Sequence, residues 1–208
     1  MKKGEKVTLI VNDREVKAKD GMTILEAARD AGIYIPTLCY NEKLAPYGAC
    51  RLCTVEISRN KRTRLVTACV YPAEDGLVVK TDTPQVLKIR KMLLELMLAS
   101  APVKTIQDLA RQYGVSKSRF KAEKTDCILC GQCVRYCAEI RRANAIGFVG
   151  RGIKRRVVFF PEIASTVCAS CRECFSLCPT GKLPSETDGV CFDDLTLEDF
   201  LSARRAGV

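Results

Sequence analysis

Cys127-Ile-Leu-Cys130-Gly-Gln-Cys133-Val-Arg-Tyr-Cys137 is the stretch that decides the fold of the second half of this chain, and residues 168–179 repeat its pattern. In both runs, three cysteines at two-residue gaps precede a fourth cysteine after three further residues. This spacing is typical of bacterial proteins with two [4Fe–4S] clusters, in which the fourth cysteine of a run ligates the other cluster. We therefore predict two interleaved ligand sets: Cys127, Cys130, Cys133 and Cys178 for one [4Fe–4S] cluster, and Cys137, Cys168, Cys171 and Cys174 for the other.

The alternatives for these runs explain the spacing less well. Structural zinc sites use two close cysteine pairs rather than triplets with a trailing fourth residue. Redox Cys-x-x-Cys motifs do not occur in overlapping sets of four. Pro179 follows the last cysteine and turns the chain, whereas Ala138 occupies the matching position after the first run. This small departure leaves the predicted ligands intact.

A third set of cysteines lies in the first half of the chain, with a gap of ten residues, then two, then fifteen: Cys39, Cys50, Cys53 and Cys69. Plant-type [2Fe–2S] proteins share the central Cys-x2-Cys and the distant last cysteine, although their first gap is four residues. The small residues Ala45, Gly48 and Ala49 would let backbone amides approach a cluster. We predict a [2Fe–2S] site here, with a zinc site or unrelated buried thiols as the alternatives. Cys191 belongs to no complete set and is expected to be a free or buried thiol.

The segments around the first set predict an α+β module. Two alternating runs flank Asn12-Asp13, which is typical of a β-hairpin. Thr23 and Glu26 form a capping-box start to a helix that ends at Gly32. The strands expected here cover residues 6–11, 14–18, 53–58, 64–70 and 77–80. These elements predict one helix packed on a mixed sheet, which is the β-grasp, ferredoxin-like arrangement.

The remaining pattern divides the chain into modules. Helices are predicted over 84–100 and 105–113, a hairpin over 144–160 around Gly150-Arg151-Gly152, and a short helix over 193–205. The Gly147–Gly152 stretch lacks the strand–loop–helix context and the Lys-Ser/Thr of a phosphate loop. The expected bounds are 1–82 for the [2Fe–2S] module, 83–120 for a helical linker, 121–192 for the bacterial-type two-[4Fe–4S] module and 193–208 for the tail.

Composition limits the function classes. The 208 residues include 13 Cys and no His, and the formal net charge is +10. Three cysteine-ligated clusters, each near −2 when oxidised, would remove about 6 charges and leave about +4. The basic balance is then weak evidence for nucleic-acid binding. No signal peptide and no apolar run of roughly 18 residues is visible. We expect a cytoplasmic protein in a reducing compartment, where clustered cysteines are metal ligands rather than disulfides.

Together these motifs resemble a known family, the small iron–sulfur (diaphorase-type) subunit of NAD(P)-linked hydrogenases and formate dehydrogenases. That subunit is similar to the N-terminal part of the large iron–sulfur subunit of complex I and of iron-only hydrogenases. The stretches that carry the resemblance are 35–40, 48–56, 90–97, 107–110 and 126–137. Many members hold one further [4Fe–4S] cluster through one His and three Cys. Residues 100–106 run directly into Gln107-Asp-Leu-Ala without that loop, so the resemblance implies a shortened form with three clusters.

The resemblance implies an electron-transfer subunit without catalytic residues of its own. It would relay single electrons between a flavin- and NAD(P)-binding diaphorase subunit and a nickel–iron hydrogenase or formate dehydrogenase subunit. Soluble ferredoxin is a further possible partner, within an electron-bifurcating complex.

Two other functions compete with this interpretation. Iron–sulfur subunits of succinate/fumarate-type enzymes also combine two such modules, but their first gap is shorter and their last motif lacks a Cys for a [3Fe–4S] cluster. A nucleic-acid-binding protein could use the basic stretch Arg151–Arg156, although a charged hairpin is more often a solvated face or a subunit contact.

Overall fold

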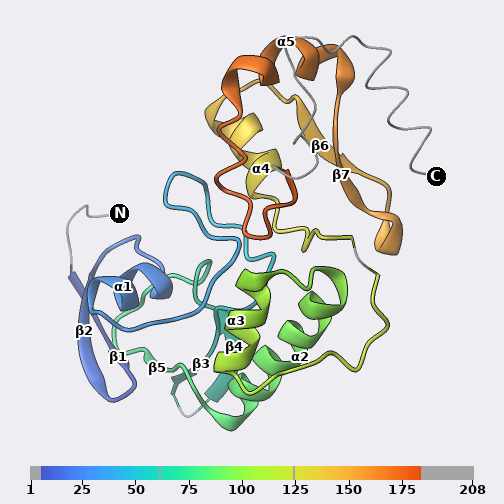
Figure 1. Cartoon of the computed structure of the whole chain (residues 1–208). Coiled ribbons are helices and arrows are strands. Elements are labelled where there is room, and N and C mark those ends of the chain that lie inside the picture. Colours follow the sequence, from blue (N-terminus) through green and yellow to red (C-terminus); the bar gives the residue numbers. More distant parts are fainter. Residues whose placement is uncertain (1–5, 61, 124, 184–208) are drawn as a thin grey trace. The chain divides into compact units, whose positions relative to one another are not determined.

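The structure is a computed structural model that describes residues 6–183 apart from 61 and 124 (Figure 1). Cys191 and the helix predicted over 193–205 therefore lie outside the described residues. The chain forms two compact units, of which the first comprises 1–40 and 46–125, and the second 41–45 and 126–208. No helix within the described ranges has the length and apolar character needed to cross a membrane.

Unit 1 is built on a five-stranded mixed sheet (Figure 1). Its strands are β1 (Lys6–Val11), β2 (Arg14–Lys19), β3 (Thr54–Arg59), β4 (Arg62–Thr67) and β5 (Val78–Lys80), arranged in the order β2-β1-β5-β3-β4. β1 pairs in parallel with β5, and the other neighbours are antiparallel. Asn12 and Asp13 both have positive φ, which is what a two-residue turn between twisted strands requires. The predicted first hairpin is thus confirmed.

Helix α1 (Ile24–Asp30) covers one face of this sheet, as predicted. Thr23 and Glu26 form a reciprocal capping box, in which each side chain accepts a hydrogen bond from the backbone of the other. The buried residues of α1 pack with alternate strand residues such as Leu9, Val55 and Val79, all fully buried. This single helix on a mixed sheet confirms the α+β class.

Two further helices complete unit 1, α2 (Pro84–Ser100) and α3 (Lys104–Gln112). The Thr83 hydroxyl caps α2 by accepting from Val86 N, and Pro84 occupies the first helical turn. Both helices match the predicted segments closely. Both helices belong to unit 1. The expected helical linker over 83–120 and the module bounds at 82, 120 and 192 remain predictions.

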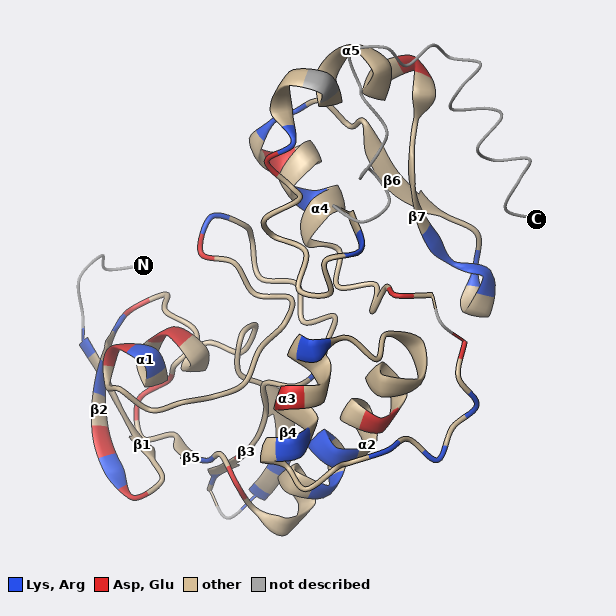
Figure 2. Cartoon of the chain, viewed as in Figure 1, with Lys and Arg blue, Asp and Glu red and all other residues tan. Residues whose placement is uncertain are grey.

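Unit 2 contains short helices around a two-stranded hairpin (Figure 1). Its elements are α4 (Gln132–Arg135), the π-helical turn η1 (Tyr136–Ile140), β6 (Ile146–Val149), the 3₁₀ turn η2 (Gly152–Lys154), β7 (Arg156–Phe159) and α5 (Pro161–Cys171). The hairpin predicted over 144–160 is therefore present. Its turn carries the Lys and Arg residues of the basic stretch (Figure 2).

Two sequence expectations differ from the structure. The strand predicted over 64–70 occupies 62–67, because the chain turns at Thr67 to bring Cys69 inward. Helix α5 is absent from the predicted elements, although Pro161 at its first position and Glu162 in its first turn are typical helix-start signals.

Candidate metal centres

The first group of cysteines is gathered by the ends of β3 and β4. Thr54 pairs with Thr67 at this end of the two strands, and Ala68 N donates to Cys53 O at 3.0 Å. The chain then turns, so that the Sγ atoms of Cys53 and Cys69 lie 3.3 Å apart. This register explains how two cysteines with fifteen residues between them become neighbours.

The other two cysteines of this group come from the loop between α1 and β3. Cys50 N donates to the Sγ of Cys39 at 3.4 Å, so a backbone amide points at one of the predicted sulfur ligands. All four side chains are at least 96% buried. Gly48 has φ +71, and a Cβ there would lie 3.0 Å from Val70 Cγ2, so the loop needs glycine at this point.

Helix α1 fixes the turn that carries Cys69. Ile24 N donates to Tyr71 O at 2.9 Å, and Leu25 N donates to Ala68 O at 3.0 Å. These two amides belong to the first turn of the helix, whose N–H groups have no partner inside the helix. The capping box therefore orients the same helix end that holds the Cys69 turn in place.

Hydrogen bonds between the thiols of this group shift their pKa values in opposite directions. Hydrogen bonds from Cys50 and Cys69 lower the pKa of Cys39 to about 2, and a hydrogen bond from Cys69 lowers the pKa of Cys53. The same bonds raise the pKa values of Cys50 and Cys69, because each of these thiols gives up a bond to a thiolate when it loses its proton. Four thiolates in so small a buried space need bound cations to balance their charge.

Behind Cys53 lies a buried basic residue that sequence reasoning did not select. Arg90 of α2 is 3% exposed, and its guanidinium donates to Leu52 O at 3.0 Å and to Thr54 O at 2.8 Å. One sequence signal could have found it: Arg90 stands four residues after Val86 and four before Leu94, on the buried stripe of the helix.

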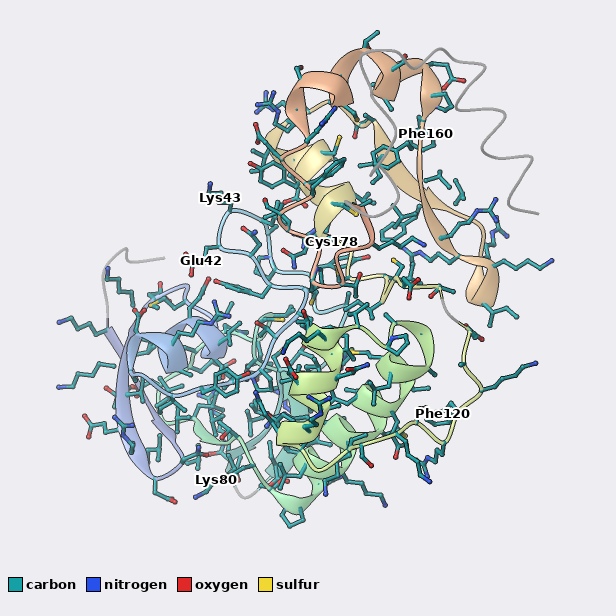
Figure 3. All side chains as sticks on the ribbon, in the orientation of Figure 1. Glu42, Lys43, Lys80, Phe120, Phe160 and Cys178 are labelled. Carbon is teal, nitrogen blue, oxygen red and sulfur yellow. The ribbon has the colours of Figure 1, made fainter. Side chains whose placement is uncertain are left out.

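In unit 2, one cavity is lined by the cysteines of one predicted interleaved set: Cys127, Cys130, Cys133 and Cys178. Cys127 and Cys130 come from the segment that leads into α4, Cys133 lies in α4, and Cys178 (labelled in Figure 3) follows α5. The Thr180 hydroxyl joins the two ends of this set, since its oxygen lies 3.4 Å from Cys178 Sγ and donates to Asp126 O at 2.8 Å. Gly131, with φ +75, lets the chain turn between two of the cysteines.

A second cavity in unit 2 is lined by the other predicted set: Cys137, Cys168, Cys171 and Cys174. Cys137 lies in the π-helical turn η1, a distortion that is common at functional sites. Ala145 N donates to Cys137 Sγ at 3.2 Å just before β6. Cys168 and Cys171 belong to the last turns of α5, and apolar Phe159 and Phe175 enclose the cavity.

Burial controls the pKa values of the thiols in unit 2. Burial and neighbouring thiolates raise the pKa of Cys133, that of Cys168 to about 11 and that of Cys174 to about 12. Burial also acts to raise the pKa of Cys178, but hydrogen bonds from Thr180 and nearby amides outweigh it and lower this pKa. The thiols of Cys133, Cys168 and Cys174 therefore stay protonated at neutral pH unless a metal displaces the proton.

The chemistry of these groups fits iron–sulfur clusters. None of the twelve described cysteines forms a disulfide, and they make up three groups of four. No three His, Cys, Asp or Glu side chains in the described ranges converge on one metal ion, and the cysteines of unit 2 instead line two cavities. Soft thiolate ligands without imidazole are the usual donors to iron–sulfur clusters.

Two family models match the chain. A "2Fe-2S iron-sulfur cluster binding domain" covers residues 4–84, and a "4Fe-4S dicluster domain" covers residues 126–182. The cofactors predicted from the cysteine spacing, one [2Fe–2S] and two [4Fe–4S] clusters, are those of these two domains.

Curated relatives match this chain along part of their greater length. The chain is 32% identical to the NADH-ubiquinone oxidoreductase 75 kDa subunit of Reclinomonas americana, over 86% of its own length and 29% of that protein. It is 30% identical to NADP-reducing hydrogenase subunit HndD of Solidesulfovibrio fructosivorans, over 85% of this chain and 36% of the relative. The chain thus spans about a third of the length of these relatives.

A solved structure covers the chain more evenly. It is that of an NAD+-reducing [NiFe]-hydrogenase in the H2-reduced state, with a TM-score of 0.66 and 30% identity. The match covers 74% of this chain and 74% of that one. With a [2Fe–2S] domain followed by a two-[4Fe–4S] domain, the chain belongs to the iron–sulfur, diaphorase-type electron-transfer subunits of NAD(P)-linked hydrogenases, a family similar to the N-terminal part of the complex I large iron–sulfur subunit.

Proposed function

We propose that this protein relays single electrons between a flavin- and NAD(P)-binding diaphorase subunit and the catalytic subunit of a nickel–iron hydrogenase or formate dehydrogenase. The observation that carries the proposal is the gathering of twelve cysteines into three groups of four within a chain related to a hydrogenase structure along three quarters of its length. Such a subunit has no catalytic residues, and its task is to accept and release electrons.

The proposed ligands are those predicted from the sequence. Cys39, Cys50, Cys53 and Cys69 would hold the [2Fe–2S] cluster. The first [4Fe–4S] cluster would be held by Cys127, Cys130, Cys133 and Cys178, and the second by Cys137, Cys168, Cys171 and Cys174. The short contacts in unit 1 and the two cysteine-lined cavities in unit 2 support these sets.

The bound clusters would supply one-electron acceptors that link the two-electron chemistry of a hydride carrier to a second redox partner. The residues of this chain hold these acceptors away from water and adjust their potentials. Amides aimed at sulfur, such as Cys50 N and Ala145 N, stabilise the negative charge of a ligand sulfur. Apolar walls such as Phe159 and Phe175 lower the local dielectric and make each such contact stronger.

The names of the relatives support the proposed partners. The hydrogenase relatives are described as NADP-reducing and NAD+-reducing, which supports a nicotinamide-linked partner subunit for this chain. Soluble ferredoxin would be a third partner if the complex is electron-bifurcating. We place the protein in the cytoplasm, where reducing conditions keep cluster-ligating cysteines free.

Purification of the native complex through a tag on this chain tests the proposal. We expect a flavoprotein to co-purify with a subunit that contains nickel, molybdenum or tungsten, as detected by metal analysis. NADH or NADPH should reduce all three clusters in the complex but none in the isolated chain. Rapid oxidation of NADH by the isolated chain with an artificial acceptor would contradict a pure relay.

A further inference from the structure

Arg90 is an unusual residue for the interior of a small domain. Its relative exposure is 3%, which places the guanidinium among the apolar side chains of α2 rather than on the polar face of the helix. Arginine is rarely fully buried unless it is paired, since removing a charge from water is costly. The structure must therefore provide a counter-charge or an equivalent set of dipoles.

The protein groups around Arg90 provide only part of that compensation. Two backbone carbonyls, Leu52 O and Thr54 O, accept hydrogen bonds from the guanidinium. The ring of Tyr113 lies 5.7 Å from the guanidinium carbon, within the range of a cation–π contact. Among the described residues, no carboxylate forms an ion pair with Arg90. The local partners are thus neutral dipoles and a π-face.

The two carbonyls show which part of the chain the Arg90 guanidinium contacts. They belong to the residues on either side of Cys53, and Cys53 O itself accepts from Ala68 N. Arg90 therefore binds the backbone that carries one proposed ligand, and Ala68 ties this backbone to the turn that carries another, Cys69. Burial lowers the pKa of Arg90, but the charges on Cys53 and Asp82 and the Tyr113 phenol act in the opposite direction. Since the pKa of a guanidinium is far above neutral pH, Arg90 stays charged.

A cluster with four thiolate ligands is anionic when oxidised, and it gains one more negative charge when it is reduced. A fixed buried cation therefore attracts the reduced cluster more strongly than the oxidised cluster. This difference is large in the protein interior, because charges are weakly screened there. We propose that Arg90 is the buried counter-charge of the [2Fe–2S] cluster, and that its positive charge raises the reduction potential of that cluster. This inference rests on the proposed ligand role of the first cysteine group.

The test is a redox titration of the full-length holoprotein, followed by electron paramagnetic resonance. In R90Q the side chain is neutral but keeps an amide donor for one carbonyl. In R90K the charge stays, but the two-pronged donor is lost. The matched control is K91M, which removes a positive charge from the next residue of α2, where the side chain is exposed. The two [4Fe–4S] clusters of each variant are internal controls.

We expect R90Q to lower the equilibrium constant for reduction of the [2Fe–2S] cluster about tenfold, which is about 59 mV for one electron. R90K should stay within about threefold of the wild type, and K91M should not differ from it. An unchanged potential in R90Q, or a decrease in R90K as large as that in R90Q, would overturn the proposal. If R90Q binds no [2Fe–2S] cluster, the R90K variant is the test. A [2Fe–2S] signal near the wild-type potential in R90K would support the role of the positive charge, and loss of that signal would argue against it.

The wild-type spectrum separates this inference from the function on which it rests. Absence of any [2Fe–2S] signal in reduced wild-type protein would refute the proposed ligand set itself. A normal wild-type signal with an unchanged R90Q potential would refute only the role of Arg90.

Discussion

The Sγ atoms of Cys53 and Cys69 lie 3.3 Å apart, although fifteen residues separate them in the chain. The antiparallel pairing of β3 with β4 creates this contact, because β3 begins at Thr54, opposite Thr67, the residue at which β4 ends and the chain turns. The arrangement of the cysteines in unit 1 therefore depends on the register of β3 and β4. A one-residue slip of β4 would turn alternate side chains to the opposite face and separate the two sulfurs.

Substitution of Cys69 by Ser should remove the [2Fe–2S] cluster alone. The loss of one thiolate breaks the pair with Cys53, while the eight proposed [4Fe–4S] ligands of unit 2 are unchanged. We expect the iron content to decrease from about 10 to about 8 atoms per chain, with the [4Fe–4S] signals unchanged. Iron analysis with electron paramagnetic resonance measures both quantities. Loss of the [4Fe–4S] signals as well would show that the groups do not load independently.

The interleaved sets in unit 2 predict opposite outcomes for two double variants. C137S/C168S removes two ligands from one cavity, and should leave one unaltered [4Fe–4S] cluster. C127S/C137S removes one ligand from each cavity, so neither cluster should keep its native signal. Electron paramagnetic resonance of the reduced proteins distinguishes them. If each run of cysteines held its own cluster instead, the two results would be exchanged.

The capping box of α1 should make stability depend on pH. Burial acts to raise the pKa of Glu26, but hydrogen bonds from Thr23 and Tyr40 outweigh it and lower this pKa below the ordinary value of 4.5. A depressed carboxyl pKa stabilises the fold above about 4.5, and this contribution is lost as the pH falls through the folded-state pKa. E26Q should therefore be less stable than the wild type near pH 7, by up to about 1 kcal/mol.

Urea unfolding of the holoprotein at several pH values measures this effect. The difference between the wild type and E26Q should shrink as the pH decreases below about 4.5. E15Q is the control, because it removes an exposed carboxylate from β2 in the same unit. A difference that stays constant across this pH range would mean that the Glu26 charge contributes nothing.

Two glycines at the β6–β7 turn should respond differently to alanine. Both have positive φ, which costs a non-glycine residue about 1–2 kcal/mol. At Gly150 a Cβ would also collide with the carbonyl of Lys154, whereas at Gly152 nothing lies within 4 Å. G150A should therefore be clearly less stable than G152A in thermal unfolding. Because Ala145 N binds Cys137 just before this hairpin, G150A should also lose its [4Fe–4S] absorbance to a chelator sooner. Equal behaviour of the two variants would contradict this account.

The sequence predicted most of what local chemistry determines. Cysteine spacing indicated the three groups of four, and the capping box and the Asn12-Asp13 turn indicated α1 and the first hairpin. These signals are spacings and residue types along the chain, so a single sequence is enough to detect them. The order of the strands was not predictable in the same way, since the parallel pairing of β1 with β5 depends on contacts distant in sequence.

Two features of the sites escaped prediction for physical reasons. The two cysteine runs share one spacing, which suggests one local structure, yet Cys168 and Cys171 lie in helix α5 whereas Cys127 and Cys130 lie outside the helices. Its spacing from Val86 and Leu94 puts Arg90 on the buried stripe of α2, but an arginine is usually exposed, so its charge favoured a solvated side chain. Its burial follows from two carbonyl acceptors contributed by another segment, and helical periodicity carries no information about them.

The interleaving of the two cysteine sets also has a consequence for the order in which they are completed during synthesis. One cavity takes its first cysteine at 127 and its last at 178, while the other needs only residues between 137 and 174. The second set is thus nested inside the first along the chain. As the polypeptide leaves the ribosome, the set between 137 and 174 is complete first. The set that begins at 127 is complete only after Cys178 has been synthesised. Cluster insertion in this half of the protein should therefore begin at the inner set and end at the outer one.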